Sequence, residues 1–388
     1  MKVRPFTALV FRPGTSHFYS PPFDTVGEKE CKELKSFPFN ITHITLPESS
    51  GMAASTLNEW KRTGVLRPTS GEVILVIEQK FEHAGKQMRR VGMLCTVEVY
   101  PPPAGIRPHE RTFPGPRKGR HELMSAIGCQ PEPIFLVVPS RRLTEILNSA
   151  VNSLPVSTSF EEPVGVANTV YVLDDPVLQG EISDALSDET AIVADGHHRL
   201  AAVREIAEEK SGNGKSGWIS ALAYVAPTVA NDLLIGGIHR VVRKRPGAEM
   251  DLQSISRLFE ITDKSDGGEG LFTIYSGKLF TATPKWETIH ANEDVDYGLA
   301  ADVVNKLIFG RCLGFTEGDM EKMVAYTHDE AYAKDAVDRG EASFSILMPE
   351  WKAQEFERKV EGGRLLPQKS TFFYPKIPSG IALYEPED

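Results

Sequence analysis

A short polar segment, Asp195 to Arg199 (DGHHR), follows directly on the apolar run Ala191–Ala194. The apolar run predicts a strand, and the periodic apolar residues after Arg199 predict a helix, so the segment marks a strand-to-helix turn. Free backbone N–H groups and the positive end of the helix dipole favour a phosphate at such a turn. Gly196 lets the backbone approach a ligand closely, and the guanidinium of Arg199 can make a bidentate charged contact. The pattern therefore predicts a phosphate-binding site.

Asp195 has two interpretations at this position. Aspartate is a good helix N-cap, which would make its role structural. It can also hold a magnesium ion if a bound phosphate supplies further ligands, because Mg²⁺ is rarely held by protein carboxylates alone. The residue types leave both roles open.

His197 and His198 are neighbours at the predicted helix start. Adjacent residues of a helix face different directions, so at most one of the two imidazoles points at the phosphate. This argues against a metal site made by the pair. A lone histidine is more often packed and hydrogen-bonded, but Asp, Gly, two His and Arg together at a helix start favour a functional role.

A second cluster, residues 108–112 (PHERT), lies between the proline-rich stretches 101–103 and 114–116. Prolines restrict the backbone on both sides, and a carboxylate held in a restrained loop, here Glu110, suits a general base. The alternative is a surface ion pair between Glu110 and a neighbouring arginine. Spacing alone favours that alternative, since exposed charge clusters are common and contribute little.

The tail from Pro367 to Lys376 gathers amide, ammonium, hydroxyl and aromatic groups between two prolines. Its Lys369, Ser370 and Thr371 can close over a substrate or its phosphate. The alternative is a C-terminal strand that docks on the core. We expect contact with the site, because the segment is chemically dense for a chain terminus.

The elements that must position these clusters alternate between strands and helices, which is typical of a mixed α/β protein. The strands at 73–81 and 91–100 flank the polar segment 82–89 and are predicted to form an antiparallel hairpin. The other expected strands are 3–11, 134–139, 169–173, 190–194, 218–225, 234–242, 271–275, 278–282 and 343–348, and the expected helices are 53–63, 120–127, 177–186, 197–210, 299–307, 329–339 and 351–360.

Length and composition set outer limits on the function. The 388 residues and 41% hydrophobic content are enough for two or three domains. A formal net charge of -10 argues against nonspecific binding of nucleic acid. The four cysteines are far apart, which argues against a zinc site. No apolar run approaches the roughly 18 residues of a membrane helix, and the charged start is unlike a signal peptide. We therefore expect a cytoplasmic protein with no membrane partner.

The motifs together resemble domain-of-unknown-function family 1015 over nearly the whole chain. They are Arg4–Phe6, Ser20–Asp24, Pro108–Thr112, Asp195–Arg199 and Pro367–Lys376. The two central motifs are also similar to the nucleotide-binding superfamily of the partitioning protein ParB, sulfiredoxin and the free serine kinase of archaea. The kinase is closest in chemistry, since its Pro-His-Glu segment activates the serine hydroxyl and an Asp-Gly-His-x-Arg turn follows later in its chain.

The resemblance implies a ParB/sulfiredoxin-like nucleotide-binding core with additional α/β segments. We expect an N-terminal α/β segment at 1–72 that packs on the core, a catalytic core at 73–245, and a C-terminal α/β domain at 246–388 with the motif-bearing tail. Sulfiredoxin needs a cysteine where this chain has His197, which argues against sulfinic-acid reduction. The acidic α/β segment after Arg243 argues against chromosome partitioning.

The activity that the resemblance implies is nucleotide-dependent phosphoryl transfer to a small hydroxyl substrate, with free L-serine and O-phosphoserine as the leading pair. ATP or ADP would be the donor and Mg²⁺ the cofactor. Alternatives are a phosphoserine phosphatase and a non-catalytic nucleotide-binding regulatory protein.

Residue roles follow from the same resemblance. It implies that Glu110 is the general base and not a member of a surface ion pair. Asp195 and His198 would be the other catalytic groups, and Asp195 would also be the metal ligand. The remaining site residues divide into two sets. The first, expected to bind nucleotide or phosphate, is Gly196, His197, Arg199 and Arg111. The second, expected to bind substrate, is His109, Thr112, Lys369, Ser370 and Thr371.

Overall fold

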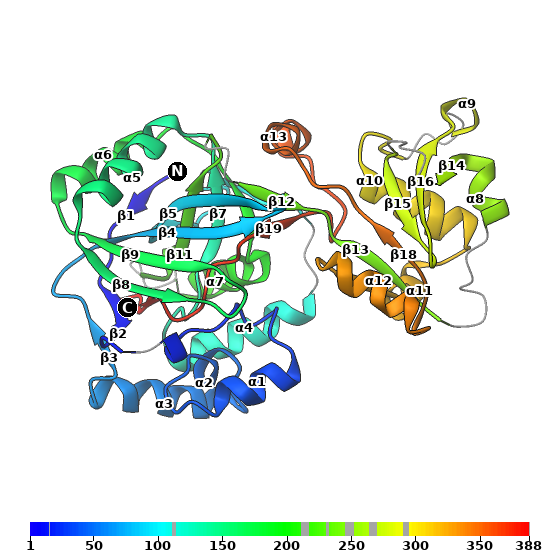
Figure 1. Ribbon diagram of the computed structural model, residues 1–388. Coiled ribbons are helices and arrows are strands. Elements are labelled where there is room, and N and C mark those ends of the chain that lie inside the picture. Colours follow the sequence, from blue (N-terminus) through cyan, green and yellow to red (C-terminus); the bar gives the residue numbers. More distant parts are fainter. Residues whose placement is uncertain are drawn as a thin grey trace. The chain divides into compact units, whose positions relative to one another are not determined.

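The computed structural model describes residues 1–14, 16–110, 114–210, 217–229, 233–244, 252–263, 270–289 and 295–387. The chain forms two compact units with a mixed α/β fold, as predicted (Figure 1). The first consists of Met1–Leu233, Gly362–Leu365 and Pro375–Asp388, and the second of Leu234–Glu361 and Leu366–Tyr374. The predicted boundary after residue 245 falls inside the second unit.

A nine-stranded sheet forms the centre of the first unit, in the order β6-β10-β7-β11-β5-β4-β9-β8, with β1 also paired to β5. Its middle strands are almost fully buried, so they read as continuous apolar runs. The strands are β1 (Val3–Arg4), β4 (Ile74–His83), β5 (Lys86–Glu98), β6 (Ile106–Arg107), β7 (Ile134–Val138), β8 (Val156–Glu161), β9 (Ala167–Leu173), β10 (Ala191–Asp195) and β11 (Ser220–Pro227).

The predicted antiparallel hairpin is confirmed in β4 and β5, but its connection is shorter than expected. Only Ala84 and Gly85 lie between the strands, and both have positive φ, 49° and 74°. Two-residue turns of this kind match the twist of the flanking strands. The polar residues on either side of the turn therefore continue the ladder, as in the pair Glu82–Gln87, instead of forming a loop.

Helices cover this sheet and complete its core. Helices α5 and α6 contact one another and strands β4, β5 and β1, whereas α7 contacts β7, β11 and helix α4. The apolar residues of α5, α6 and α7 join those of the sheet in one buried cluster. The helices of this unit are α1 (Glu28–Lys35), α2 (Thr42–Thr45), α3 (Ser50–Arg62), α4 (Pro114–Ile127), α5 (Arg141–Ser153), α6 (Pro176–Leu186) and α7 (His197–Lys210), with short 3₁₀ turns η1 (Ser16–Phe18) and η3 (Gly217–Ile219).

The N-terminal residues contribute to two sheets. The predicted strand 3–11 is interrupted: β1 joins the large sheet, whereas β2 (Ala8–Phe11) lies between β3 (Leu66–Pro68) and β20 (Leu383–Tyr384). This small sheet and helix α3 bury a second apolar cluster, which includes Trp60. The C-terminal segment, red in Figure 1, thus returns to pair with the beginning of the chain.

The second unit is built on a six-stranded sheet in the order β14-β16-β15-β18-β13-β17. The single strand predicted at 234–242 is wrong. It divides into β12 and β13, because β12 pairs with β19 in a separate two-stranded sheet. The strands are β12 (Leu234–Gly236), β13 (His239–Arg243), β14 (Phe259–Asp263), β15 (Phe272–Tyr275), β16 (Leu279–Pro284), β17 (Val324–Thr327), β18 (Ala342–Leu347) and β19 (Phe372–Tyr374).

Among its described residues, the second unit contains the three predicted helices, one of them in altered form, and three short helices that were not predicted. The helix predicted at 299–307 is the short helix α10 (Ala300–Val303), which continues as the π-helix η5 (Val304–Cys312). The others are α8 (Leu252–Leu258), α9 (Trp286–Ile289), α11 (Glu317–Met323), α12 (Glu330–Asp338) and α13 (Ala353–Val360). The 3₁₀ turn η6 (Glu361–Gly363) begins at the last residue of the stretch Leu234–Glu361 and continues into residues of the first unit.

Candidate functional site

The two central motifs meet because their strands are neighbours. Strand β6 pairs in parallel with β10, with Ala191 opposite Ile106 and Ile192 opposite Arg107. The carboxyl ends of parallel strands lie at the same edge of a sheet, which is where open α/β sheets bind ligands. His109 follows β6 and the DGHHR turn ends β10, so both motifs lie at this edge.

His109 locks the two motifs together. It is only 1% exposed, and its Nδ1 contacts the carbonyl oxygen of Val193 in β10. A carbonyl oxygen only accepts, so Nδ1 carries the proton. The Nε2 atom lies 3.6 Å from Oε1 of Glu110, and the ring centroid lies 4.9 Å from that of His197. Glu110 therefore reaches the edge of the predicted phosphate site.

His197 is a neutral imidazole in this environment. Burial is the main cause that lowers the pKa of His197 to about 3, His109 acts in the same direction, and the negative charges of Glu110 and Asp195 oppose the shift only in part. Its Nε2 atom is buried and has no hydrogen-bond partner among the residues that the structure describes. A neutral ring at a helix start can donate a hydrogen bond without adding charge. His198 follows it on the first turn of α7 and is half-buried.

Asp195 lies between two cationic side chains. Its Oδ1 accepts a hydrogen bond from Nζ of Lys376, and its Oδ2 accepts one from Nη2 of Arg199 at 2.5 Å. Burial alone would raise the pKa of Asp195, but Lys376 and Arg199 outweigh it, and the pKa is lowered. Asp195 is therefore ionised and its carboxylate faces cations, so these contacts give no support to an N-cap role.

The donor set at Asp195 does not fit a magnesium ion in this arrangement, since each carboxylate oxygen already accepts from a cation. Across the described ranges, no three or more His, Cys, Asp or Glu side chains are grouped so as to hold a metal ion. The contacts assign Asp195 a different role: it holds Lys376 and Arg199 at the start of α7.

Arg199 is fixed on both sides. Its Nη1 donates to the carbonyl oxygen of Pro133 at 2.5 Å, and the residue is only 6% exposed. Gly196 turns the chain between β10 and α7 with φ of +84°, a conformation that side chains with a Cβ rarely adopt. A Cβ there would lie 3.0 Å from Nε of Arg199. The glycine is thus required for the turn and for the position of the arginine.

A buried carboxylic acid, Glu132, interacts electrostatically with Arg199 of this turn. Glu132 is 5% exposed and accepts hydrogen bonds from Oγ of Ser379 at 2.6 Å and from the backbone N–H of Phe23 at 3.1 Å. Burial raises the pKa of Glu132, and the charges of Arg199 and Arg120 oppose that shift. The Phe23 ring lies 4.0 Å from the Arg120 guanidinium carbon. The Ser20–Asp24 motif, which carried no predicted role, therefore supports the site.

The structure adds Lys376, Glu132 and Arg120 to the groups found from the sequence. Lys376 ends the tail motif, and the density of polar groups in that motif was a signal for it, but Lys369 was the lysine predicted to contact the substrate. Nothing local in the sequence marks Glu132 or Arg120, since each is important only through side chains distant along the chain.

The other predicted residues belong to the second unit or lie outside the described residues. Lys369, Ser370 and Thr371 belong to the second unit, where Ser370 donates to the carbonyl oxygen of Pro367 at 2.5 Å and accepts at its own carbonyl from Trp351 at 3.0 Å. Their role as substrate contacts stays a prediction. Arg111 and Thr112 lie outside the described residues.

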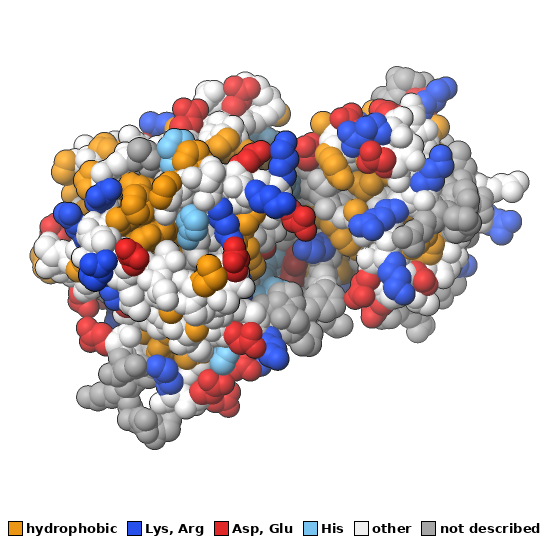
Figure 2. Space-filling view, turned by 90° about the horizontal axis from the view of Figure 1, so that it is seen from below, with side chains coloured by type: hydrophobic (Ala, Val, Ile, Leu, Met, Phe, Trp, Pro, Cys, Tyr) orange, Lys and Arg blue, Asp and Glu red, His pale blue; other side chains and the backbone are white. Residues whose placement is uncertain are grey.

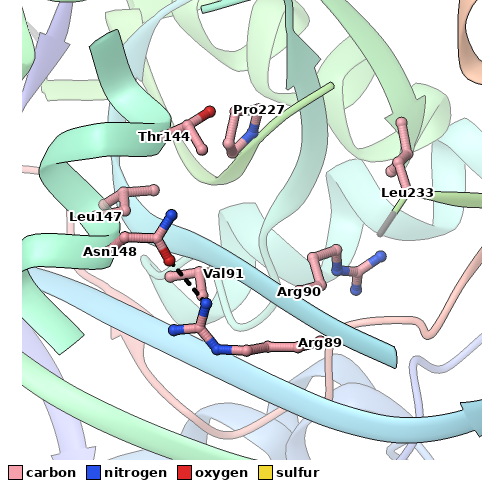
Figure 3. Close-up of a pocket in the computed structure, with 8 residues that line it drawn as sticks. All are labelled: Arg89, Arg90, Val91, Thr144, Leu147, Asn148, Pro227 and Leu233. Atoms are coloured by element: carbon pink, nitrogen blue, oxygen red, sulfur yellow. Dashed lines mark hydrogen bonds between the residues drawn. The ribbon is translucent and has the colours of Figure 1, made fainter. Parts of the chain in front are cut away.

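A small pocket is lined by residues outside the motifs (Figure 3). Its volume is about 30 Å³, which suits a water molecule or two and not a nucleotide. Its lining consists of Arg89, Arg90, Val91, Thr144, Leu147, Asn148, Pro227 and Leu233. It shares no residue with the Asp195 site.

The distribution of surface charge and the length of the helices bear on possible partners. Figure 2 shows basic and acidic side chains interspersed over the face it presents, without a stripe of one sign. None of the helices that the structure describes is both long and apolar enough to cross a bilayer.

Comparison with known proteins places the chain in a family. The model of the family described as "Protein of unknown function (DUF1015)" matches residues 3–307. The chain belongs to this family. The resemblance noted in the motifs is thereby confirmed, and Lys376 lies beyond the part of the chain that the family model covers. No curated protein matches this family member.

The solved structures to which the chain is similar include the following three. A conserved hypothetical protein from Pyrococcus furiosus is 16% identical, with a TM-score of 0.36 over 72% of this chain and 91% of that chain. A free serine kinase in complex with AMP is 15% identical, with a TM-score of 0.38 over 72% and 89%. SbnI with a C-terminal truncation, from Staphylococcus aureus, is 11% identical, with a TM-score of 0.40 over 75% and 87%.

Proposed function

We propose that this protein transfers a phosphoryl group between a nucleotide and a small hydroxyl compound at the edge of β6 and β10. The observation that carries the proposal is the junction of the two motifs. Glu110, a carboxylate in the loop after β6, lies 3.6 Å from Nε2 of His109 and acts electrostatically on His197 at the start of α7, where Arg199 and Lys376 supply positive charge. A base next to an anion cradle is the minimum that phosphoryl transfer to a hydroxyl requires.

Glu110 is the proposed general base. It accepts the proton of the substrate hydroxyl as the hydroxyl oxygen attacks the phosphorus atom of the terminal phosphate. The bond between that phosphorus and the bridging oxygen of the nucleotide breaks, and the nucleotide leaves one phosphate shorter. The proton on Glu110 then passes to water. The carboxylate is 17% exposed in its side chain, so it keeps a route to solvent.

The first turn of α7 is the proposed phosphate cradle. The backbone N–H groups after Gly196 have no carbonyl partner within the helix, and the helix dipole favours an anion there. Arg199 and Lys376 add charge that is already oriented by Asp195, so little reorganisation is needed as charge develops on the phosphoryl oxygens. His197 and His198 are the proposed hydrogen-bonding groups at this turn.

The proposed substrate pair is free L-serine and O-phosphoserine, on the strength of the PHE and DGHHR motifs and their likeness to those of the free serine kinases. ATP or ADP is the proposed donor. Mg²⁺ is proposed to arrive on the nucleotide phosphates, since phosphates and water are its usual partners in such sites and Asp195 faces cations. Arg111, His109, Thr112, Lys369, Ser370 and Thr371 stay as proposed contacts of nucleotide or substrate.

Phosphorus NMR of the purified protein tests the proposal directly. One set of tubes holds Mg²⁺, L-serine and either ATP or ADP, and a second holds O-phosphoserine alone or with AMP or ADP. Formation of phosphoserine, or loss of phosphoserine only when nucleotide is present, is the expected result. Release of inorganic phosphate without nucleotide would support a phosphatase instead.

The same samples distinguish the proposed transferase from a non-catalytic nucleotide-binding regulatory protein. Nucleotide binding by calorimetry without any change in the phosphorus spectrum would support a regulatory nucleotide-binding protein and contradict the proposed transfer. His198→Ala provides a further check, because a contact with phosphate predicts lost activity in a protein that still folds. Loss of soluble protein would instead indicate a packed histidine.

A further inference from the structure

Arg90 is a buried cation that the proposed reaction does not use. It lies on β5, is 3% exposed, and donates to the carbonyl oxygen of Pro375 in the C-terminal segment. Its Nε and Nη2 also donate to Oε1 of Gln79, at 3.2 and 2.5 Å. Breaking a buried charged contact by removing one partner is costly, so this geometry fixes the backbone at Pro375.

Two aromatic rings hold the guanidinium of Arg90 from the sides. Its carbon lies 4.9 Å from the ring centroid of Phe135 and 5.4 Å from that of Tyr224. Gly92 makes room for this arrangement, because a Cβ at that position would lie 2.4 Å from the Tyr224 ring. Contacts of a desolvated guanidinium with aromatic faces stabilise its position. Arg90 therefore has one orientation, toward the C-terminal segment.

Gln79 makes the second contact with this segment. Its Nε2 donates to the carbonyl oxygen of Lys376 at 3.2 Å and to Oδ1 of Asn168 at 3.0 Å. The Nδ2 of Asn168 in turn donates to Oε1 of Glu162 at 2.8 Å. The side-chain amides of Gln79 and Asn168 each donate a hydrogen bond through nitrogen and accept one through oxygen. The orientation of Gln79 is thus determined by its neighbours.

The consecutive carbonyl groups of Pro375 and Lys376 are both held, and the ammonium group of Lys376 contacts Asp195. We propose that Arg90 and Gln79 form a clamp on residues 375–376 and act as positioning residues that place the Lys376 ammonium at the start of α7. The clamp reaches the candidate site only through Lys376. Its effect on turnover rests on the proposed function, but its effect on the position of Lys376 does not.

Arg89, the preceding residue of β5, is a matched control. Figure 3 shows the side chains of Arg89 and Arg90 pointing in different directions, as expected for successive residues of a strand. Arg89 donates to Oδ1 of Asn148 at 2.7 Å and to Oε1 of Glu78 at 2.5 Å, and Glu78 is itself buried. It is thus a partly buried, ion-paired arginine of the same strand whose side-chain contacts among the described residues are with Asn148 and Glu78 and not with the C-terminal segment.

The first test follows Lys376 without any assay of activity. Wild type, Arg90→Lys and Arg89→Lys are labelled with an amine-reactive reagent, and modification of Lys376 is quantified by mass spectrometry, with hydrogen exchange of peptides covering 375–387. A lysine cannot reproduce the forked contacts of Arg90. We expect Lys376 labelling and exchange to rise at least about fivefold in Arg90→Lys and to stay at the wild-type level in Arg89→Lys. Equal changes in both variants, or no change in Arg90→Lys, would overturn the clamp.

The second test is a double-mutant cycle on phosphoryl transfer. If Arg90 acts through Lys376, Arg90→Lys should lower kcat about 10- to 100-fold in the wild-type background and have no further effect in a Lys376→Met background. KM for the nucleotide should change much less than kcat in the single Arg90 variant. An equal loss in both backgrounds would contradict the proposal.

Two outcomes distinguish the clamp from the reaction. Protein that shows no transfer at all but releases Lys376 in Arg90→Lys would retain the clamp and reject the proposed function. If Arg90→Lys does not yield folded protein, Gln79→Glu replaces it, because that change removes the donor to Lys376 and keeps an acceptor for Arg90. An unchanged Lys376 label in folded Gln79→Glu would then reject the clamp.

Discussion

The ring centroids of His109 and His197 lie 4.9 Å apart, with the two planes inclined at 62°. One ring belongs to the loop after β6 and the other to the first turn of α7, so this contact joins the two motifs directly. Since His109 is also bonded to the backbone of β10, the loop that carries Glu110 cannot move independently of the turn. The proposed base and the proposed phosphate cradle are therefore held together at the edge of the sheet where β6 and β10 end.

Glu110→Gln should separate chemistry from folding. The amide keeps the shape of the side chain but cannot accept the hydroxyl proton, so we expect kcat to fall about 10²- to 10⁴-fold. The melting temperature should stay near that of wild type, since the side chain is at the edge of the site. Glu122→Gln, an exposed position of α4, is the control and should keep full activity. Wild-type kcat in Glu110→Gln would remove Glu110 as the base.

Asp195→Asn should destabilise the fold strongly. The change leaves Lys376 and Arg199 facing a neutral amide in a buried place, and removing one partner of a buried ion pair costs about 3–5 kcal/mol. The pKa of Asp195 is lower in the folded protein than in the unfolded chain. The ion pairs of Asp195 therefore stabilise the fold fully above the ordinary carboxyl pKa, and this stability is lost as pH falls toward the lowered pKa. Urea unfolding at pH 7 measures the cost, with the exposed Asp184→Asn as a control expected to be near neutral. A cost below about 1 kcal/mol would contradict the assigned role.

Gly196→Ala tests the turn itself. Alanine at a φ of +84° is strained, and its Cβ would approach Arg199 within 3.0 Å. We expect a loss of about 1–3 kcal/mol in stability together with reduced nucleotide affinity. Gly180→Ala, in the middle of α6 where a Cβ meets no atom within 4 Å, is the control and should be neutral or slightly stabilising. Similar results for the two variants would show that the turn has no special requirement for glycine.

His197 should remain neutral across the physiological range. Its pKa is lowered from 6.5 to about 3, chiefly by burial, so between these values the unfolded chain binds more protons than the folded one. Stability attributable to His197 is therefore full above pH 6.5 and is lost as pH falls toward 3. Nitrogen-15 NMR of the imidazoles checks this, since the His197 signals should not titrate between about pH 5 and 8. A midpoint near 6.5 would contradict the buried, neutral state.

Glu162→Gln tests the residue that accepts a hydrogen bond from Asn168, the partner of Gln79. Its effect on stability depends on pH in the direction opposite to that of His197. Burial raises the pKa of Glu162 from 4.5 to about 7, so the folded protein binds the proton more tightly and stability falls as pH rises through that window. Glutamine lacks the charge and keeps an acceptor for Asn168. We expect the variant to gain up to about 3 kcal/mol relative to wild type between pH 4.5 and 8. Parallel stability curves for the two proteins over this range would refute the assignment.

Much of the first unit follows from local patterns. The hairpin of β4 and β5 was predicted from runs rich in β-branched residues, strand β10 from an apolar run and helix α7 from helical apolar spacing, and each lies within about five residues of its expected bounds. Strand 234–242 was predicted as one element and is two, because β12 and β13 pair in different sheets. Local sequence does not encode which sheet a strand will join.

The candidate site shows the same division between local and long-range information. The chemical groups of both motifs and the strand-to-helix turn at Gly196 could be predicted from local sequence, since these depend on neighbouring residues. The contacts of Asp195 with Lys376 and Arg199, the neutral state of His197 and the hold of Arg90 on the C-terminal segment arise only from the folded arrangement. Lys376 lies 181 residues from its partner Asp195. A lysine becomes a fixed cation of the site only where folding removes water from around it and places a carboxylate within reach, and neither condition is written in its neighbours along the chain.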